Sequence, residues 1–300
     1  MQRFDLRDLR EARARHPELV VEAAGRRTRR PLLGCDGRLL VLAADHPARG
    51  ALGVGADTSA MADRGELLRR LALCLGCPGV DGVLGTPDIL EDLLLLGALD
   101  DKVVFVSMNR GGLHGASFEL DDRFTAANAE TIAAMGFDGG KMLCRIDLTD
   151  RGSLDTLEAC GRAVTELAGR GLVAMIEPFM SRVEGGRVRN VLSTEAVVRS
   201  VAIAAGLGAT SARTWLKLPV VEDMEAVTAA TTLPTLLLGG DPATAPADTH
   251  SRWEKALRLP GVRGMVIGRA LLYPPDGSED VGVGALADLV HPPSAEVELQ

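Results

Sequence analysis

From residue 38 onward, short runs of Val, Leu and Ile alternate with longer stretches in which apolar residues recur every three to four positions. The runs are apolar throughout, which is typical of strands buried on both faces, and parallel strands need crossover helices between them. Eight such units predict an α/β protein with a single (β/α)8 barrel, with a doubly wound open sheet as the alternative. The predicted strands are 38–45, 82–85, 102–107, 139–144, 171–177, 214–219, 234–240 and 264–269, and the predicted helices are 62–75, 87–97, 124–135, 153–169, 194–207, 222–230 and 249–258.

The regions outside this alternation are short. Residues 1–37 are rich in Arg, but acidic residues interleave with them, so we expect a helical extension that packs on the barrel and not a nucleic-acid-binding arm. No low-complexity linker divides the chain. The predicted organisation is therefore a helical extension over 1–37, one barrel over 38–290 and a tail over 291–300.

Composition narrows the class of protein. Of the 300 residues, 46% are hydrophobic, which is enough for a large core. The net charge of −8 argues against nucleic acid as a partner, and the lack of an apolar run of about 18 residues argues against a membrane. No secretory signal is recognisable at the start, and the five Cys suggest no disulfide framework, so we expect a cytoplasmic protein.

Lysine is rare, because only four of the 33 basic residues are Lys. Arg cannot lose its proton in a protein whereas a buried Lys can, so each Lys is a candidate for chemistry that needs a free amine. Lys217 lies within the strand predicted over 214–219, where burial should lower its pKa and leave an amine that can form a Schiff base. Lys141 lies within 139–144 and would lower the pKa of Lys217 further, or hold a phosphate or an oxyanion. The alternatives are a salt-bridged or snorkelling Lys217 and a Lys141 whose ammonium reaches water.

Acid–base residues end two other predicted strands. Glu177 lies between the strands of the two lysines, where a carboxylate could move protons at the carbinolamine stage or could be a buried ion-pair partner only. Pro178 is expected to end that strand. Asp45 and His46 follow the first strand, in AADHPARG. Asp45 could bind a substrate hydroxyl or the amine, or merely cap the loop, and His46 is a further acid–base candidate.

Glycine and basic residues follow three more strands. The loops after the seventh and eighth strands of such barrels often bind phosphate, because glycine lets backbone N–H groups approach an anion and Arg adds a bidentate donor. Asp241 would oppose a phosphate there and is expected to cap the next helix. The loop SMNRGGLHG after the third strand is a candidate substrate loop or a plain glycine-rich turn. The candidate substrate- and phosphate-binding residues are Gly239, Gly240, Gly268, Arg269, His46, Asn109 and Arg110.

Several other chemistries lack their motifs. Cys74 and Cys77 form a lone CxxC, whereas a zinc ribbon needs a second pair, and the five His show no HxxxH or HExxH spacing. No GxGxxG opens a helix after the first strand, and neither GxxxxGK[ST] nor GxSxG occurs. We therefore expect neither a metal nor a cofactor.

Together these segments resemble the Schiff-base aldolases of the deoxyribose-phosphate and tagatose-bisphosphate aldolase superfamily. The matching motifs are AADHPARG, GGKML, MIEPF, WLKLPV, LLGG and GMVIGRAL, spread over about residues 38–272, and the likeness is greatest to the tagatose-bisphosphate type. The resemblance implies that Lys217 forms the Schiff base, Glu177 moves protons and Lys141 assists electrostatically. Asp45 matches the strand-one Asp of the related fructose-bisphosphate aldolases. The implied phosphate cradle is Gly240, Gly268 and Arg269.

The sequence also departs from the family pattern. Its single Tyr, Tyr273, follows the eighth predicted strand, so branches that use a strand-five Tyr as proton donor match poorly. The first strand ends in DHP, where DHG or DQR is commoner. These departures bear on the substrate more than on the chemistry.

The expected function is that of a metal-independent class I aldolase. It would act on a phosphorylated ketose or keto-sugar acid and give dihydroxyacetone phosphate or another triose phosphate. Deoxyribose phosphate, a ketohexose bisphosphate, a sulfo-sugar phosphate and a deoxy-keto-gluconate phosphate are the candidate substrates. The alternatives are another imine-forming enzyme (a transaldolase, a dehydratase or a thiolase-like enzyme) and a non-catalytic sugar-phosphate sensor. The expected partners are the phosphorylated sugar and, because such barrels often self-associate, further copies of the chain.

Overall fold

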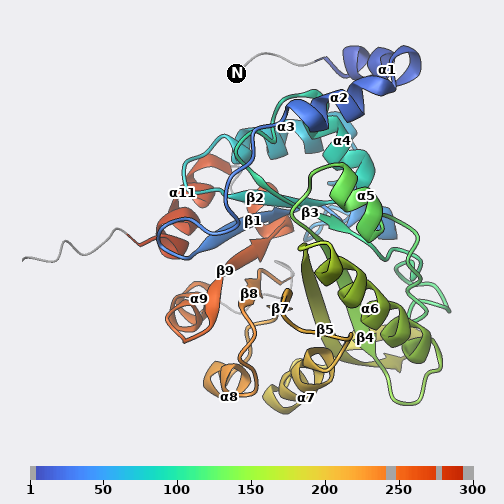
Figure 1. The fold of residues 1–300 in the computed structure, drawn as a ribbon. Helices are drawn as coiled ribbons and strands as arrows, with labels where there is room; N and C mark the ends of the chain where they lie inside the picture. Colours follow the sequence, from blue (N-terminus) through green and yellow to red (C-terminus); the bar gives the residue numbers. More distant parts are fainter. Residues whose placement is uncertain (1–4, 241–247, 275–278, 293–300) are drawn as a thin grey trace, which may run out of the picture.

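Eight parallel strands close into a barrel in the computed structural model, which describes residues 5–240, 248–274 and 279–292 (Figure 1). The hydrogen-bonded order is β1–β2–β3–β4–β5–β7–β8–β9, and β9 returns to β1. This closure confirms the (β/α)8 barrel and excludes the open doubly wound sheet, which would leave two edges unpaired. The barrel strands are β1 (Leu39–Ala43), β2 (Gly82–Gly85), β3 (Val103–Ser107), β4 (Gly139–Ile146), β5 (Val173–Glu184), β7 (Thr214–Leu218), β8 (Thr235–Leu238) and β9 (Val262–Ile267).

Helices follow the strands and surround the barrel (Figure 1). Polar residues fix where several of them begin, because their side chains accept hydrogen bonds from otherwise unpaired backbone N–H groups: Asp63 caps α3 and Ser193 caps α7. Asp241, expected as a cap, and residues 293–300 of the predicted tail lie outside the described residues. The helices around the barrel are η1 (Pro47–Arg49), α3 (Arg64–Leu75), α4 (Pro87–Leu95), α5 (Ala129–Ala134), α6 (Gly152–Gly169), α7 (Thr194–Ala205), α8 (Met224–Ala229), α9 (Thr249–Leu257), α10 (Arg269–Leu272) and α11 (Glu279–Val290).

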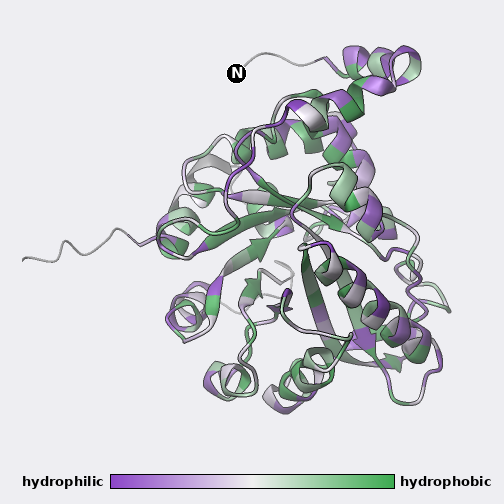
Figure 2. Ribbon diagram, in the orientation of Figure 1, coloured by the Kyte–Doolittle hydropathy of each residue, from purple (hydrophilic) through white to green (hydrophobic). Residues whose placement is uncertain are grey.

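The strand side chains divide between two hydrophobic clusters. One cluster lies between the strands and the helices, and the other fills the barrel axis. Figure 2 shows the barrel strands as mainly hydrophobic. Side chains two residues apart on a strand point to the same face, so the residue two positions after the last axial residue of a strand also points into the barrel. These positions lie at the carboxyl ends of the strands, and polar residues occupy several of them. The axial residues Ala43, Phe105, Met175 and Trp215 are followed two positions later by Asp45, Ser107, Glu177 and Lys217.

The prediction that Pro178 ends its strand was wrong. β5 continues through Pro178 to Glu184 and pairs beyond the barrel with the antiparallel strand β6 (Arg187–Asn190). At Pro178 the strand is paired with β4 alone, since its pairing with β7 ends at Ile176. Proline lacks a backbone N–H, and a strand tolerates it where one side is unpaired.

The first two helices and the segment after them pack on the barrel. α1 (Leu6–Arg15) and α2 (Glu18–Arg26) lie beside α4, and Arg13 forms ion pairs of 2.7 and 2.9 Å with Asp92 and Glu91 of that helix (Figure 1). The segment that follows places Leu32 and Leu33 against the axial cluster. None of the described helices combines the length and apolarity that crossing a lipid bilayer requires.

His291 ties the end of α11 to the barrel. Its Nδ1 lies 2.5 Å from Asp36 Oδ2, and its Nε2 lies 3.0 Å from Asp81 Oδ2. Asp81 also accepts a hydrogen bond of 2.7 Å from the backbone N–H of Leu40 and pairs with Arg30. The carboxylates of Asp81 and Asp36 raise the pKa of His291 to about 9, so the imidazole is charged at neutral pH.

We expect His291→Gln to lower the free energy of unfolding at pH 6 by about 1–3 kcal/mol. Because the folded-state pKa of about 9 exceeds the ordinary value of 6.5, this stabilisation is fully present below pH 6.5 and is lost as the pH rises through 9. Urea denaturation at pH 6 and about pH 9.5 measures the loss. His250→Gln on α9, where the side chain is exposed, is the control and should change neither value. A His291→Gln variant as stable as the parent chain at pH 6 would contradict this prediction.

Candidate active site

Four charged side chains meet at the carboxyl end of the barrel. Lys141 comes from β4, Glu177 from β5, Lys217 from β7, and Asp45 follows β1. Glu177 lies between the two lysines, with Oε2 2.5 Å from Lys141 Nζ and Oε1 3.1 Å from Lys217 Nζ. Lys141 Nζ also donates a hydrogen bond of 3.1 Å to Asp45 Oδ2. The structure therefore brings together the four residues that the sequence singled out for catalysis.

Burial and mutual attraction set the charge states of this centre. Lys217 is 4% exposed and Lys141 is 2% exposed. Burial lowers the pKa of Lys141 well below its ordinary value, and the positive charges of Arg110 and Lys217 act in the same direction, whereas Glu177 opposes them. Burial alone would raise the pKa of Glu177, but the two ammonium groups hold it well below the ordinary range. The carboxylate is therefore charged at neutral pH and is available as a proton acceptor.

Asp45 is held by donors from β3 and β4. Ser107 donates a hydrogen bond of 2.7 Å to Asp45 Oδ2, the atom that also accepts from Lys141, and Arg110 pairs with the same oxygen. Arg110 in turn donates a hydrogen bond of 2.6 Å to Ser107 Oγ. Three donors fix this carboxylate in one orientation, beside the amine of Lys141.

The candidate phosphate residues stand at the ends of β8 and β9. Gly240 has φ +73°, in the left-handed region, which glycine adopts without strain. A Cβ on Gly268 would lie 2.4 Å from the carbonyl oxygen of Ala43, so only glycine fits there. Burial and the positive charges of Arg269, Lys217 and Lys141 lower the pKa of His46 to about 3, which leaves this imidazole neutral. Arg269 begins α10 directly after Gly268, and Gly239 follows β8.

Asn109 lies at the same end of the barrel with both ends of its amide engaged. Its Nδ2 donates to the carbonyl oxygen of Leu143 at 2.6 Å, and its Oδ1 accepts from the N–H of Leu143 at 2.9 Å. These bonds join the two segments two residues beyond the last β3–β4 register pair, Ser107 with Lys141. In this structure Asn109 holds the loop after β3 on β4, and a contact with substrate stays a prediction.

Sequence reasoning missed five buried polar residues around the site. Arg145 follows Lys141 by four residues on the same face of β4, so strand alternation could have indicated it, whereas Arg49 lies in η1, where no such alternation applies. Glu119 and Asp122 lie in the long loop after β3, where no periodic signal exists. The missed residues are Ser107, Arg49, Arg145, Glu119 and Asp122.

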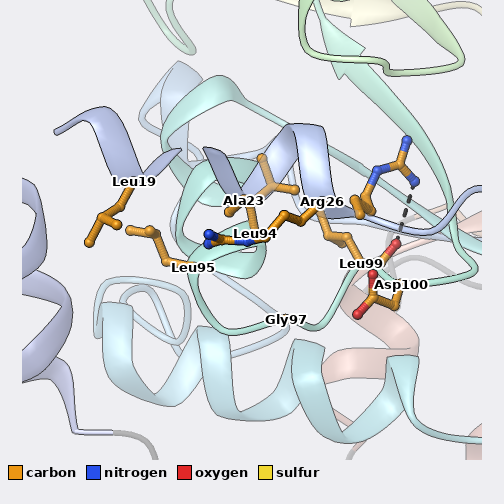
Figure 3. Close-up of a pocket in the computed structure, with 9 residues that line it drawn as sticks. Leu19, Ala23, Arg26, Leu94, Leu95, Gly97, Leu99 and Asp100 are labelled. Carbon is orange, nitrogen blue, oxygen red and sulfur yellow. Dashed lines mark hydrogen bonds between the residues drawn. The ribbon is translucent and has the colours of Figure 1, made fainter. Parts of the chain in front are cut away.

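A cavity of about 290 Å³ lies elsewhere, between α2 and the segment after α4 (Figure 3). Leu19, Ala23 and Leu95 line it, with Asp100 at its edge. Asp100 lies three residues before β3 begins, so this cavity is near the amino ends of the strands, whereas the charged centre is at their carboxyl ends. Arg27, beside this cavity, donates hydrogen bonds to backbone carbonyl oxygens and so has a structural role.

The fold and the central residues define a (β/α)8 barrel with a buried lysine–glutamate–lysine centre. The chain belongs to the Cgl0159-like family, whose sequence profile matches residues 37–287. The crystal structure of Cgl0159 from Corynebacterium glutamicum is 57% identical to it, with 95% of this chain and 96% of that chain covered and a TM-score of 0.93.

Two fructose-1,6-bisphosphate aldolase structures share the fold at lower identity. A Schiff-base-forming enzyme is 22% identical, with 90% of this chain and 99% of that chain covered and a TM-score of 0.62. An archaeal enzyme is 21% identical, with 91% and 99% covered and a TM-score of 0.62. A comparison with curated proteins finds no match.

We expect Glu177→Gln to lower the free energy of unfolding at pH 7 by about 3–5 kcal/mol, because it leaves two buried ammonium groups without their carboxylate. The double variant Glu177→Gln/Lys141→Met removes one of those charges and should recover part of the loss. Urea denaturation measures both variants. The control is Glu184→Gln, where an exposed carboxylate pairs with Arg182. Equal effects at Glu177 and Glu184 would contradict the buried charge pair.

Proposed function

We propose that the protein is a class I aldolase that uses Lys217 as its Schiff-base residue. The observation that carries the proposal is the buried contact of Lys217 with Glu177, which also bonds Lys141. A barrel wall supplies the desolvation that an amine nucleophile needs, and the carboxylate supplies a place for its proton. The fold shared with a Schiff-base-forming fructose-1,6-bisphosphate aldolase supports the same assignment.

The proposed reaction begins with the carbonyl of a phosphorylated ketose or keto-sugar acid. Glu177, 3.1 Å away, accepts a proton from the Lys217 ammonium group, and the neutral amine so formed attacks the carbonyl carbon. The carboxyl group returns this proton to the carbonyl oxygen, which becomes the carbinolamine hydroxyl. A second proton then passes through Glu177 from the nitrogen to this hydroxyl, which leaves as water and gives a protonated imine. Lys141 lies beside Glu177 and stabilises its charged form between these transfers.

Carbon–carbon cleavage follows from the imine. A base removes the proton from the hydroxyl on the far side of the scissile bond, and Asp45, fixed by Ser107 and Lys141, is the carboxylate we assign to this step. The bonding electrons move to the iminium nitrogen, the aldehyde departs and an enamine remains. Protonation of the enamine carbon and hydrolysis of the imine release the triose phosphate and restore the amine.

The phosphate of the substrate is assigned to the β8–β9 end of the site. Gly240 has a left-handed backbone with nothing within 4 Å of a Cβ position, so its N–H group is our candidate donor to the phosphate, and Arg269 adds positive charge. The neutral His46 nearby contributes a hydrogen-bond donor or acceptor without opposing the anion.

The first test is trapping. Borohydride reduction with dihydroxyacetone phosphate should add the ligand covalently to Lys217, as read by mass spectrometry of peptides. Lys217→Met and Lys217→Arg should give no adduct and no cleavage, because neither side chain offers an amine that can lose its proton. Lys255→Met, on the exposed face of α9, is the matched control and should behave as the parent chain. Full activity in Lys217→Met would reject the proposal.

The second test concerns the phosphate. We expect Arg269→Ala to raise the KM for dihydroxyacetone phosphate in the trapping or exchange reaction about tenfold to hundredfold, because a charged hydrogen bond is lost. The same variant should change the KM for unphosphorylated dihydroxyacetone little. A similar loss for both ligands would show that Arg269 shapes the loop and does not bind the phosphate.

A further inference from the structure

Three buried arginines gather around the ends of β1, β3 and β4. Arg49 follows β1, Arg110 follows β3, and Arg145 lies near the end of β4. Their exposed fractions are 8%, 6% and 6%. Burying a guanidinium is costly unless an anion compensates it, so each of them needs a partner.

Two carboxylates compensate two of these arginines. Arg49 lies 3.0 Å from Asp122 and 3.4 Å from Glu119, and Arg145 lies 2.5 Å from the carboxylate of Glu119 and donates to its backbone carbonyl. The two lysines of the centre are matched by Asp45 and Glu177 in the same way. The cluster thus holds five cationic side chains and four carboxylates, and Arg110 shares Asp45 with Lys141, which leaves one positive charge in excess.

Two guanidinium N–H donors among these three arginines are unpaired. The Nε atoms of Arg110 and Arg145 are buried and have no hydrogen-bond partner. Burial lowers the pKa of Arg110 to about 10, so this guanidinium is charged at neutral pH. An anion between the two side chains would satisfy the open donors and neutralise the cluster.

The position of these arginines fits the far end of a substrate. Arg145 shares the inward face of β4 with Lys141 and lies four residues closer to the carboxyl end, or about 13 Å along the strand. β3 and β4 stand across the ring of eight strands from β8 and β9, which carry the assigned phosphate loop. A molecule with its phosphate at β8–β9 and its carbonyl at Lys217 would extend toward Arg110 and Arg145.

We propose that Arg110 and Arg145 form a second anion-binding subsite, which takes a singly charged acid group, a carboxylate or a sulfonate, at the end of the substrate remote from its phosphate. The proposal rests on the proposed function. A single excess positive charge matches a monoanion, whereas a second phosphate would bring a charge of about −2. The substrate class is then a phosphorylated keto-sugar acid or sulfo-sugar, and neither deoxyribose phosphate nor a sugar bisphosphate.

Isothermal titration of unreactive chain analogues tests the subsite without requiring the Schiff base. The probes are 6-(phosphonooxy)hexanoate, 5-(phosphonooxy)pentane-1-sulfonate, hexane-1,6-diol bisphosphate and the neutral match 6-hydroxyhexyl phosphate. We expect the carboxylate, the sulfonate or both to bind about tenfold to hundredfold more tightly than the hydroxyl probe, and more tightly than the bisphosphate. Whichever of the two binds more tightly identifies the acid group.

Arg145→Gln should abolish most of that gain while the Kd of 6-hydroxyhexyl phosphate moves less. Arg145→Lys, which keeps the charge, should retain part of the gain, and Arg182→Gln on the exposed β5–β6 hairpin is the matched control. Binding of the four probes to the unsubstituted protein tests the subsite even if Arg145→Gln fails to fold. Equal Kd values for the acid and hydroxyl probes, or tightest binding of the bisphosphate, would overturn the subsite. A subsite that binds while borohydride traps nothing on Lys217 would instead overturn the proposed function alone.

Discussion

The arrangement of the site depends on one carboxylate between two ammonium groups. Glu177 lies within 2.5 Å of Lys141 and 3.1 Å of Lys217, where water hardly reaches. Either lysine alone would be expensive to bury, and the carboxylate would be too. Each group therefore fixes the charge and position of the others, and Asp45 extends the same network to β1.

The barrel makes this arrangement possible by separating an apolar layer from a polar one. Inward side chains up to Phe105, Met175 and Trp215 exclude water from the axis. The next inward positions, two residues further along the strands, are polar and lie directly against this apolar layer. The effective dielectric constant is low there, so electrostatic interactions are strong. At the opposite end, the segment after α2 places Leu32 and Leu33 against the same axial cluster.

Much of the fold and of the central site could be predicted from the sequence. Each of the eight predicted runs overlaps a barrel strand, because strands buried on both faces leave an uninterrupted apolar signal. The rarity of Lys was informative for two positions, Lys141 and Lys217. It was not informative for Lys102, which donates to the carbonyl of Val80, or for the exposed Lys255. A residue type narrows the chemistry, but the strand position decides whether the side chain is buried.

The sequence by itself determined the order of strands and helices and which strand ends carry Asp45, Lys141, Glu177 and Lys217, because these depend on local periodicity. Only the tertiary structure decided that Arg49, Glu119, Asp122 and Arg145 form one buried network, since barrel closure brings together loops separated by up to about 100 residues. It also decided that β5 passes through Pro178, because that depends on which neighbours the strand has, and a single chain segment does not encode its neighbours.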